Sequence, residues 1–112
     1  MENKNRQWVL RSDTASQTVA PGLVRTVLAY SDNIMAVENQ FEKGAVGALH
    51  SHPHTQLTYI LSGEFEFTIG EETKIVKAGD TLFKSSGVVH GCTCLESGAM
   101  LDVFTPMRED FI

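Results

Sequence analysis

The sequence predicts an all-β protein with a single domain, and three observations support this fold class. The 112 residues are enough for one hydrophobic core but too few for two domains. Apolar residues do not recur with helical spacing, whereas short runs rich in Val, Ile, Phe and Thr alternate with Gly, Asp and Ser. Many short strands of this kind favour a sandwich or a barrel over an open sheet.

The chain is expected to divide into an N-terminal segment and one domain. Residues 1–22 are predicted to be an arm or an extra strand, because Trp8-Val9-Leu10 lies between polar neighbours and Pro21-Gly22 follows. Residues 23–112 are predicted to form the domain. Its apolar runs predict strands, in chain order, at residues 23–29, 34–41, 48–52, 57–61, 64–69, 74–77, 81–84, 89–95 and 100–104.

One of these strands shows the clearest alternation. Phe65, Phe67 and Ile69 are separated by polar residues, so one face of the strand is predicted to be apolar and the other solvated. Ser62-Gly63 before this strand and Gly70-Glu71 after it are predicted to be hairpin turns.

The last predicted strand has apolar side chains on both faces. Met100, Asp102 and Phe104 share one face, while Leu101 and Val103 share the other. A small barrel cannot bury so much apolar surface by itself, so we expect a homodimer in which two sheets pack back to back.

Composition and charge exclude several classes of partner. The formal net charge of −5 argues against a nucleic-acid or anionic-membrane surface. No run approaches the ~18 apolar residues of a membrane span, and the polar N-terminus lacks a signal-peptide core, so we expect a cytoplasmic protein. Cys92 and Cys94 lie two positions apart on one strand, where a disulfide is geometrically poor, and are predicted to be packing residues.

Three histidines and a glutamine are the candidate metal ligands. Alternate residues of a strand point to the same side, about 6.6 to 6.8 Å apart, so His50 and His52 can present two imidazoles to one ion. Gln56 has the same parity but follows a bend expected at Pro53. His90 is expected to join them from a strand that lies opposite, across the barrel interior.

These ligands fall on two motifs that resemble those of the cupin family. The first motif matches at Gly44, His50, His52, Gln56 and Gly63, and the second at Gly79, Ser85, Gly87, His90 and Cys94. The spacing is intact, although Gln56, Ser85 and Cys94 replace the usual Glu, Pro and Asn. The resemblance implies a cupin double-stranded β-helix, or jelly-roll barrel, that binds one divalent metal ion and leaves His54 at its rim.

Gln56 makes the ligand set neutral. An ion bound by three imidazoles and one amide oxygen keeps its full charge, so it is expected to be a stronger Lewis acid and to attract anions. Such donors suit zinc, nickel, iron, cobalt or manganese with little discrimination.

The run from residue 50 to 70 and the ending from residue 101 to 111 are similar to the single-domain cupins of pectin and alginate breakdown. This resemblance implies an enzyme that opens the ring of 4,5-unsaturated monouronates to give the linear 5-keto-4-deoxyuronate. The similarity extends from about residue 24 to the end of the chain.

The ending also supplies groups that suit a sugar-acid substrate. Asp102 and Phe104 project from one strand face, and Arg108 can curl back over the mouth after Pro106 ends the strand. We expect Asp102 to take the proton of the anomeric hydroxyl, Arg108 to bind the carboxylate and Phe104 to stack on the sugar.

Two other functions remain open at this point. A mononuclear site with an open position could belong to an iron-dependent dioxygenase. A cupin can also bind or sense a small molecule without catalysis.

Overall fold

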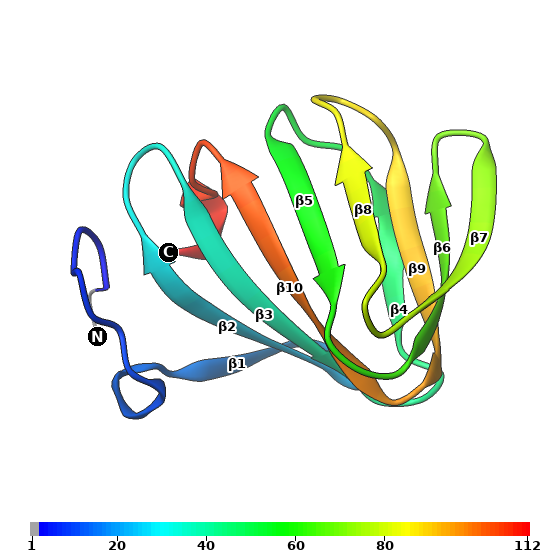
Figure 1. The fold of residues 1–112 in the computed structure, drawn as a ribbon, viewed down its shortest axis with the longest axis horizontal. Coiled ribbons are helices and arrows are strands. Elements are labelled where there is room, and N and C mark those ends of the chain that lie inside the picture. Colours follow the sequence, from blue (N-terminus) through cyan, green and yellow to red (C-terminus); the bar gives the residue numbers. More distant parts are fainter. Residues whose placement is uncertain (1–2) are drawn as a thin grey trace.

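The protein folds into two antiparallel sheets that face each other, which confirms the predicted all-β class (Figure 1). The computed structural model describes residues 3–112. The strands are β1 (Ser16–Ala20), β2 (Leu23–Tyr30), β3 (Met35–Phe41), β4 (Val46–His50), β5 (Thr55–Ile60), β6 (Glu64–Ile69), β7 (Glu72–Lys77), β8 (Thr81–Lys84), β9 (His90–Glu96) and β10 (Gly98–Thr105). The arrangement is the jelly roll expected from the sequence.

The two sheets differ in size. The larger sheet has six strands in the order β1-β2-β3-β10-β5-β8, and the smaller has four in the order β4-β9-β6-β7. Strands that are adjacent in sequence therefore often belong to different sheets. The link from β5 to β6 is one of these, so the hairpin predicted at Ser62-Gly63 is wrong: this turn carries the chain from the larger sheet to the smaller.

All nine predicted strands agree with the structure to within two residues at each end. The difference that matters is in the strand predicted at residues 48–52, which is β4 and ends at His50. His52 consequently lies in the loop between β4 and β5. Among the first 22 residues, β1 pairs antiparallel with β2, while the division of the chain at residue 22 stays a prediction.

The core lies between the inward faces of the two sheets. Phe65 and Phe67 of β6 are buried while Glu66 between them is exposed, as the alternation predicted. Phe65 meets Phe41 of β3 edge to face, with ring centroids 5.2 Å apart, so aromatic packing joins the sheets. A second cluster, at the other end of the larger sheet, contains Tyr30, Met35, Val37 and Phe104.

Helical structure is limited to two short 3-10 helices in the part of the chain that the structure describes, at Arg11–Asp13 and Glu109–Phe111. Within residues 3–112, no helix has the length and apolar character needed to cross a membrane.

Candidate metal centre and cavity

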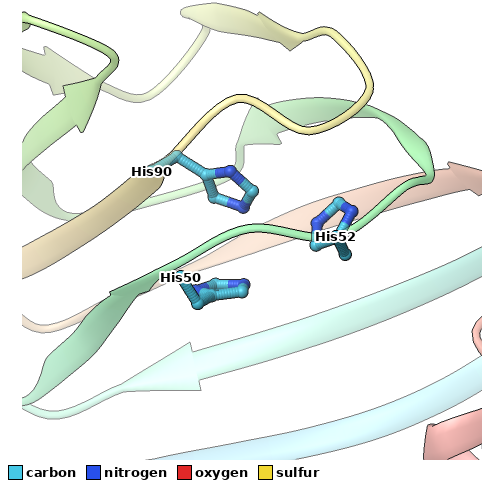
Figure 2. Close-up of side chains that lie close together, drawn as sticks. All are labelled: His50, His52 and His90. Atoms are coloured by element: carbon cyan, nitrogen blue, oxygen red, sulfur yellow. The ribbon is translucent and has the colours of Figure 1, made fainter.

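Three histidine rings converge at one end of the barrel (Figure 2). His50 is the last residue of β4, His52 lies in the following loop, and His90 is the first residue of β9. One ring nitrogen from each lies within 4.8 Å of the corresponding atoms of the other two. Imidazoles at this separation can bind a single ion after small side-chain adjustments.

The strand of His90 lies beside that of His50, which corrects the expectation that it lies opposite. β4 and β9 are neighbours in the smaller sheet, and His50 is paired directly with His90 in their register. The two ring centroids are accordingly only 4.5 Å apart. The opposite side of the candidate site is formed by Gln56, which belongs to the larger sheet.

Backbone contacts orient two of the rings. His50 Nδ1 lies 2.7 Å from the Ala48 carbonyl oxygen, and His90 Nδ1 lies 3.1 Å from the Val88 carbonyl oxygen. When Nδ1–H donates to these oxygens, Nε2 of each ring has a lone pair for a metal. His90 Nε2 is buried and has no hydrogen-bond partner among residues 3–112, as expected at a site that fits an ion.

The Gln56 amide is oriented by its neighbours. Its Nε2 donates to Asp102 Oδ1 over 2.9 Å, which turns Oε1 towards His52 Nε2, also 2.9 Å away. Two ligands bound about 2.1 Å from one ion and at right angles to each other would be roughly 3 Å apart. The geometry therefore fits Gln56 as an oxygen ligand next to His52.

Burial favours the neutral imidazoles that a metal requires. The pKa of His90 is lowered from 6.5 to about 4, mainly because burial penalises the charged ring. Burial also lowers the pKa of His52, partly opposed by its contact with Gln56. Both rings are thus ready to bind a metal at neutral pH without first releasing a proton.

Asp102 is at the centre of a buried hydrogen-bond network. Its Oδ1 accepts hydrogen bonds from Gln56 and from the Thr58 hydroxyl, and its Oδ2 accepts one from Asn39 Nδ2 over 2.7 Å. A carboxylate has about four lone-pair positions, so one position on Oδ2 remains for a ligand. The network fixes the Asp102 carboxylate towards the cavity.

Lys84 completes this network and was not predicted from the sequence. Its Nζ donates to the Thr58 hydroxyl over 2.6 Å and lies 3.9 Å from Asp102 Oδ1. The ammonium also lies 4.4 Å from the centroid of the Phe67 ring. Burial lowers the pKa of Lys84, and the charge of Asp102 opposes this shift. A lysine in an amphiphilic strand carries no motif, so only the fold reveals its position.

Three of the four candidate ligands and the predicted substrate-binding residues line one cavity of about 280 Å³. Asp102, Phe104 and Arg108 all contribute to its wall, together with His50, Gln56 and His90. Arg108 is buried, and its guanidinium lies 5.1 Å from the centroid of the Phe104 ring. The arrangement combines possible metal ligands, a carboxylate, an aromatic surface and a cation in one concave space.

Two other sequence predictions concern residues near the metal centre. His54 Nε2 contacts the Met107 carbonyl oxygen at 3.0 Å; its ring centroid lies 5.4 Å from that of His52, but His54 is not one of the three grouped histidines. Cys92 and Cys94 are free thiols packed in the core. Burial raises the pKa of Cys92 to about 11, so it remains a thiol at neutral pH and behaves as a packing residue.

Comparisons with known proteins agree on the fold. Residues 38–104 match the model of the cupin domain family. The chain is 36% identical to the pectin degradation protein KdgF of Dickeya dadantii over 109 residues, which cover 96% of the chain and 99% of that protein.

Solved structures give the same result. An RmlC-like cupin from Shewanella frigidimarina superposes with a TM-score of 0.94 and 34% identity, covering 99% of this chain and 100% of that one. KdgF from a Halomonas species superposes with a TM-score of 0.90 and 31% identity, covering 96% and 100% of the two chains.

Proposed function

The chain belongs to the cupin family, and from this premise we propose that it is a metal-dependent enzyme that opens the ring of 4,5-unsaturated monouronates. The product is the linear 5-keto-4-deoxyuronate, so the reaction is an isomerisation. The similarity over nearly the full length to KdgF, a pectin degradation protein by name, supports this substrate class.

The observation that carries the proposal is the shared cavity. A sugar acid needs a cation for its carboxylate and a surface for its ring, and Arg108 and Phe104 provide these beside the candidate metal ligands. A divalent ion held by His50, His52, Gln56 and His90 would supply Lewis acidity towards the substrate oxygens. Zinc, nickel, iron, cobalt and manganese remain candidates for this neutral ligand set.

Asp102 has the central role in moving protons. Its carboxylate accepts the proton of the hydroxyl group at C1 of the sugar, which becomes an aldehyde as the bond between C1 and the ring oxygen breaks. The electron pair of that bond passes to the ring oxygen and leaves an enolate across C4, C5 and the former ring oxygen. Asp102 then returns the proton to C4, and the oxygen at C5 becomes a ketone, so atoms and electrons balance without an oxidant.

The hydrogen bonds around Asp102 support this role. Gln56, Thr58 and Asn39 hold the carboxylate in place, and Lys84 balances its charge. A base that is already oriented does not need to reorganise when the substrate binds. Asp102→Ala is expected to lose turnover more than binding, whereas Arg108→Ala should mainly lose binding.

An anaerobic assay tests the proposal. Metal-loaded protein is mixed with a 4,5-unsaturated monouronate under nitrogen, and the ultraviolet absorbance of the conjugated enol is followed while NMR identifies the product. Loss of the band with formation of the linear keto acid supports ring opening. Turnover that requires oxygen would instead indicate a dioxygenase, and binding without turnover would indicate a non-catalytic cupin.

A further inference from the structure

The mouth of the cavity contains an ion pair within the C-terminal segment. Arg108 donates to both carboxylate oxygens of Asp110, from Nε over 3.0 Å and from Nη2 over 2.8 Å. The Arg108 side chain is 10% exposed, whereas that of Asp110 is 61% exposed. The buried cation therefore holds an anion that is itself mostly in water.

A second arginine, from β2, contacts the same aromatic ring as Arg108. The guanidinium carbon of Arg25 lies 3.8 Å from the centroid of the Phe111 ring, and that of Arg108 lies 4.3 Å from the same centroid. Both arginines and Asp110 line the cavity. Over residues 3–112, Arg25 donates no side-chain hydrogen bond, so its donors are available to a ligand.

We propose that Arg25 and Arg108 form one carboxylate-binding site and that Asp110 occupies it until the carboxylate of the substrate takes its place. The sugar-acid ligand in this inference rests on the proposed function. Asp110 is thereby a specificity residue, because it competes with any ligand for the Arg108 guanidinium.

The physical reason is the cost of leaving a buried charge unpaired. Exchanging one carboxylate for another keeps Arg108 paired, and the released Asp110 side chain is already largely hydrated. A neutral sugar offers no replacement charge, so it cannot displace Asp110 at similar cost. The exchange therefore selects sugar acids over neutral sugars, and Arg25 adds a second charge-assisted contact to the bound carboxylate.

A purely structural role for Asp110 makes a different prediction. The ion pair could serve only to fix the 3-10 helix Glu109–Phe111 over the cavity, which would keep Phe111 against Phe104. Removing the Asp110 charge would then loosen the mouth and weaken ligand binding. If Asp110 instead competes with the ligand, removing its charge should tighten ligand binding.

Calorimetry with zinc-loaded protein distinguishes these roles, using saturated galacturonate as the probe because it lacks the reactive double bond. Asp110→Asn should bind galacturonate about fivefold or more tightly than Glu109→Gln, which makes the same charge change at an exposed neighbouring position. Arg25→Gln should weaken binding about tenfold. The affinity for galactose should be the same, within error, in all of these variants.

The wild-type protein provides a test that does not depend on how the variants fold. The NMR signals of the side-chain N–H groups of Arg25 and Arg108 should both shift with galacturonate but not with galactose. Equal or weaker galacturonate binding by Asp110→Asn than by Glu109→Gln, or unshifted arginine signals, would overturn the inference.

The outcome is separable from that of the proposed function. Turnover of unsaturated monouronate by the wild type, with no gain in affinity for Asp110→Asn, would refute the exchange and leave ring opening intact. The predicted affinities without any turnover would support the exchange and refute ring opening.

Discussion

Among single residues, Lys84 offsets the negative charge of the Asp102 carboxylate in the cavity. Its side chain is 2% exposed and lies near a carboxylate that is 4% exposed. A buried pair of this kind adds little net stability, but the loss of one partner leaves the other charge uncompensated in a medium of low polarity.

Replacing Lys84 by methionine tests this balance. The Lys84→Met variant should lose about 3–5 kcal/mol of unfolding free energy, because Asp102 is left as an unpaired buried charge. Urea unfolding measures the loss. Lys74→Met is a suitable control, since Lys74 is exposed and its change should cost less than about 1 kcal/mol.

A double variant distinguishes charge from packing. Lys84→Met combined with Asp102→Asn should recover much of the lost stability, because neither buried charge remains and the amide oxygen still accepts hydrogen bonds. Additive losses in the double variant would show that packing, and not the ion pair, determines the effect of Lys84.

Gln56 links the metal site to the proposed base. A glutamate at this position would still offer an oxygen to the metal, but it would add a negative charge where Nε2 now donates to Asp102. Gln56→Glu should therefore retain the metal and bind galacturonate about tenfold or more weakly. Metal analysis and calorimetry measure the two effects, with Gln7→Glu as a control of equal charge at an exposed position. Unchanged affinity and turnover would refute the argument for a neutral ligand set.

Individual residues of the site differ in how well the sequence predicts them. The histidines have a characteristic spacing, and the side chains of Asp102 and Phe104 share a strand face by simple alternation. Lys84 and Arg25 have neither kind of signal. Their importance depends on which strands become neighbours in space. Patterns of single residues along the sequence do not predict this.

Among the elements, the pairing of β4 with β9 determines the geometry of the histidines. Gly91 follows His90 in β9, and a Cβ atom placed there would lie 2.7 Å from the Gly47 carbonyl oxygen and 2.9 Å from the Leu49 nitrogen. The two backbones approach so closely only because position 91 has no side chain.

Gly91→Ala tests the role of this close approach. The added methyl group should force β4 away from β9, cost about 1–3 kcal/mol of stability and weaken metal binding, because His50 and His90 separate. Thermal unfolding and a cobalt titration measure both effects. Gly79→Ala is a useful comparison, because an added Cβ would meet no other atom there. Only its positive φ of +93° should lower the stability, and metal affinity should not change. Metal affinity reduced equally in both variants would contradict the proposed role of the pairing.

Strands could be predicted from the sequence, but their assignment to sheets could not. Alternation identified the buried face of β6, and Gly70-Glu71 correctly marked the hairpin to β7. The same kind of signal at Ser62-Gly63 failed, because a turn within a sheet and a turn between sheets use similar residues. The predicted position of His90 was wrong for the same reason: no local sequence pattern shows which strands, far apart in the chain, pair with each other.

In the molecule as a whole, the outer face of the larger sheet carries an apolar patch on β5 and β8. Leu57 and Phe83 are direct partners across β5 and β8, and their exposed fractions are 52% and 61%. Tyr59 lies two positions along the same strand and is 45% exposed. This face suits the back-to-back homodimer expected from the sequence, which stays a prediction together with the cytoplasmic location.

Sedimentation measurements test the homodimer. Phe83→Glu should convert the dimer into a monomer, because it places a charge in the apolar contact. Ile75→Glu makes a comparable change on β7 of the smaller sheet, where Ile75 is 55% exposed, and should leave the dimer intact. A monomeric wild-type protein, or dissociation by Ile75→Glu alone, would exclude this interface.

The proposed uronate ring opening should require one ion held by four neutral side chains. The initial rate of loss of the unsaturated monouronate, measured against the number of divalent ions bound per chain, tests this requirement. The rate should rise in proportion to bound metal, reach its maximum at one ion per chain, and fall at least about a hundredfold in His90→Gln. An unchanged rate in chelator-treated, metal-free protein would contradict the requirement.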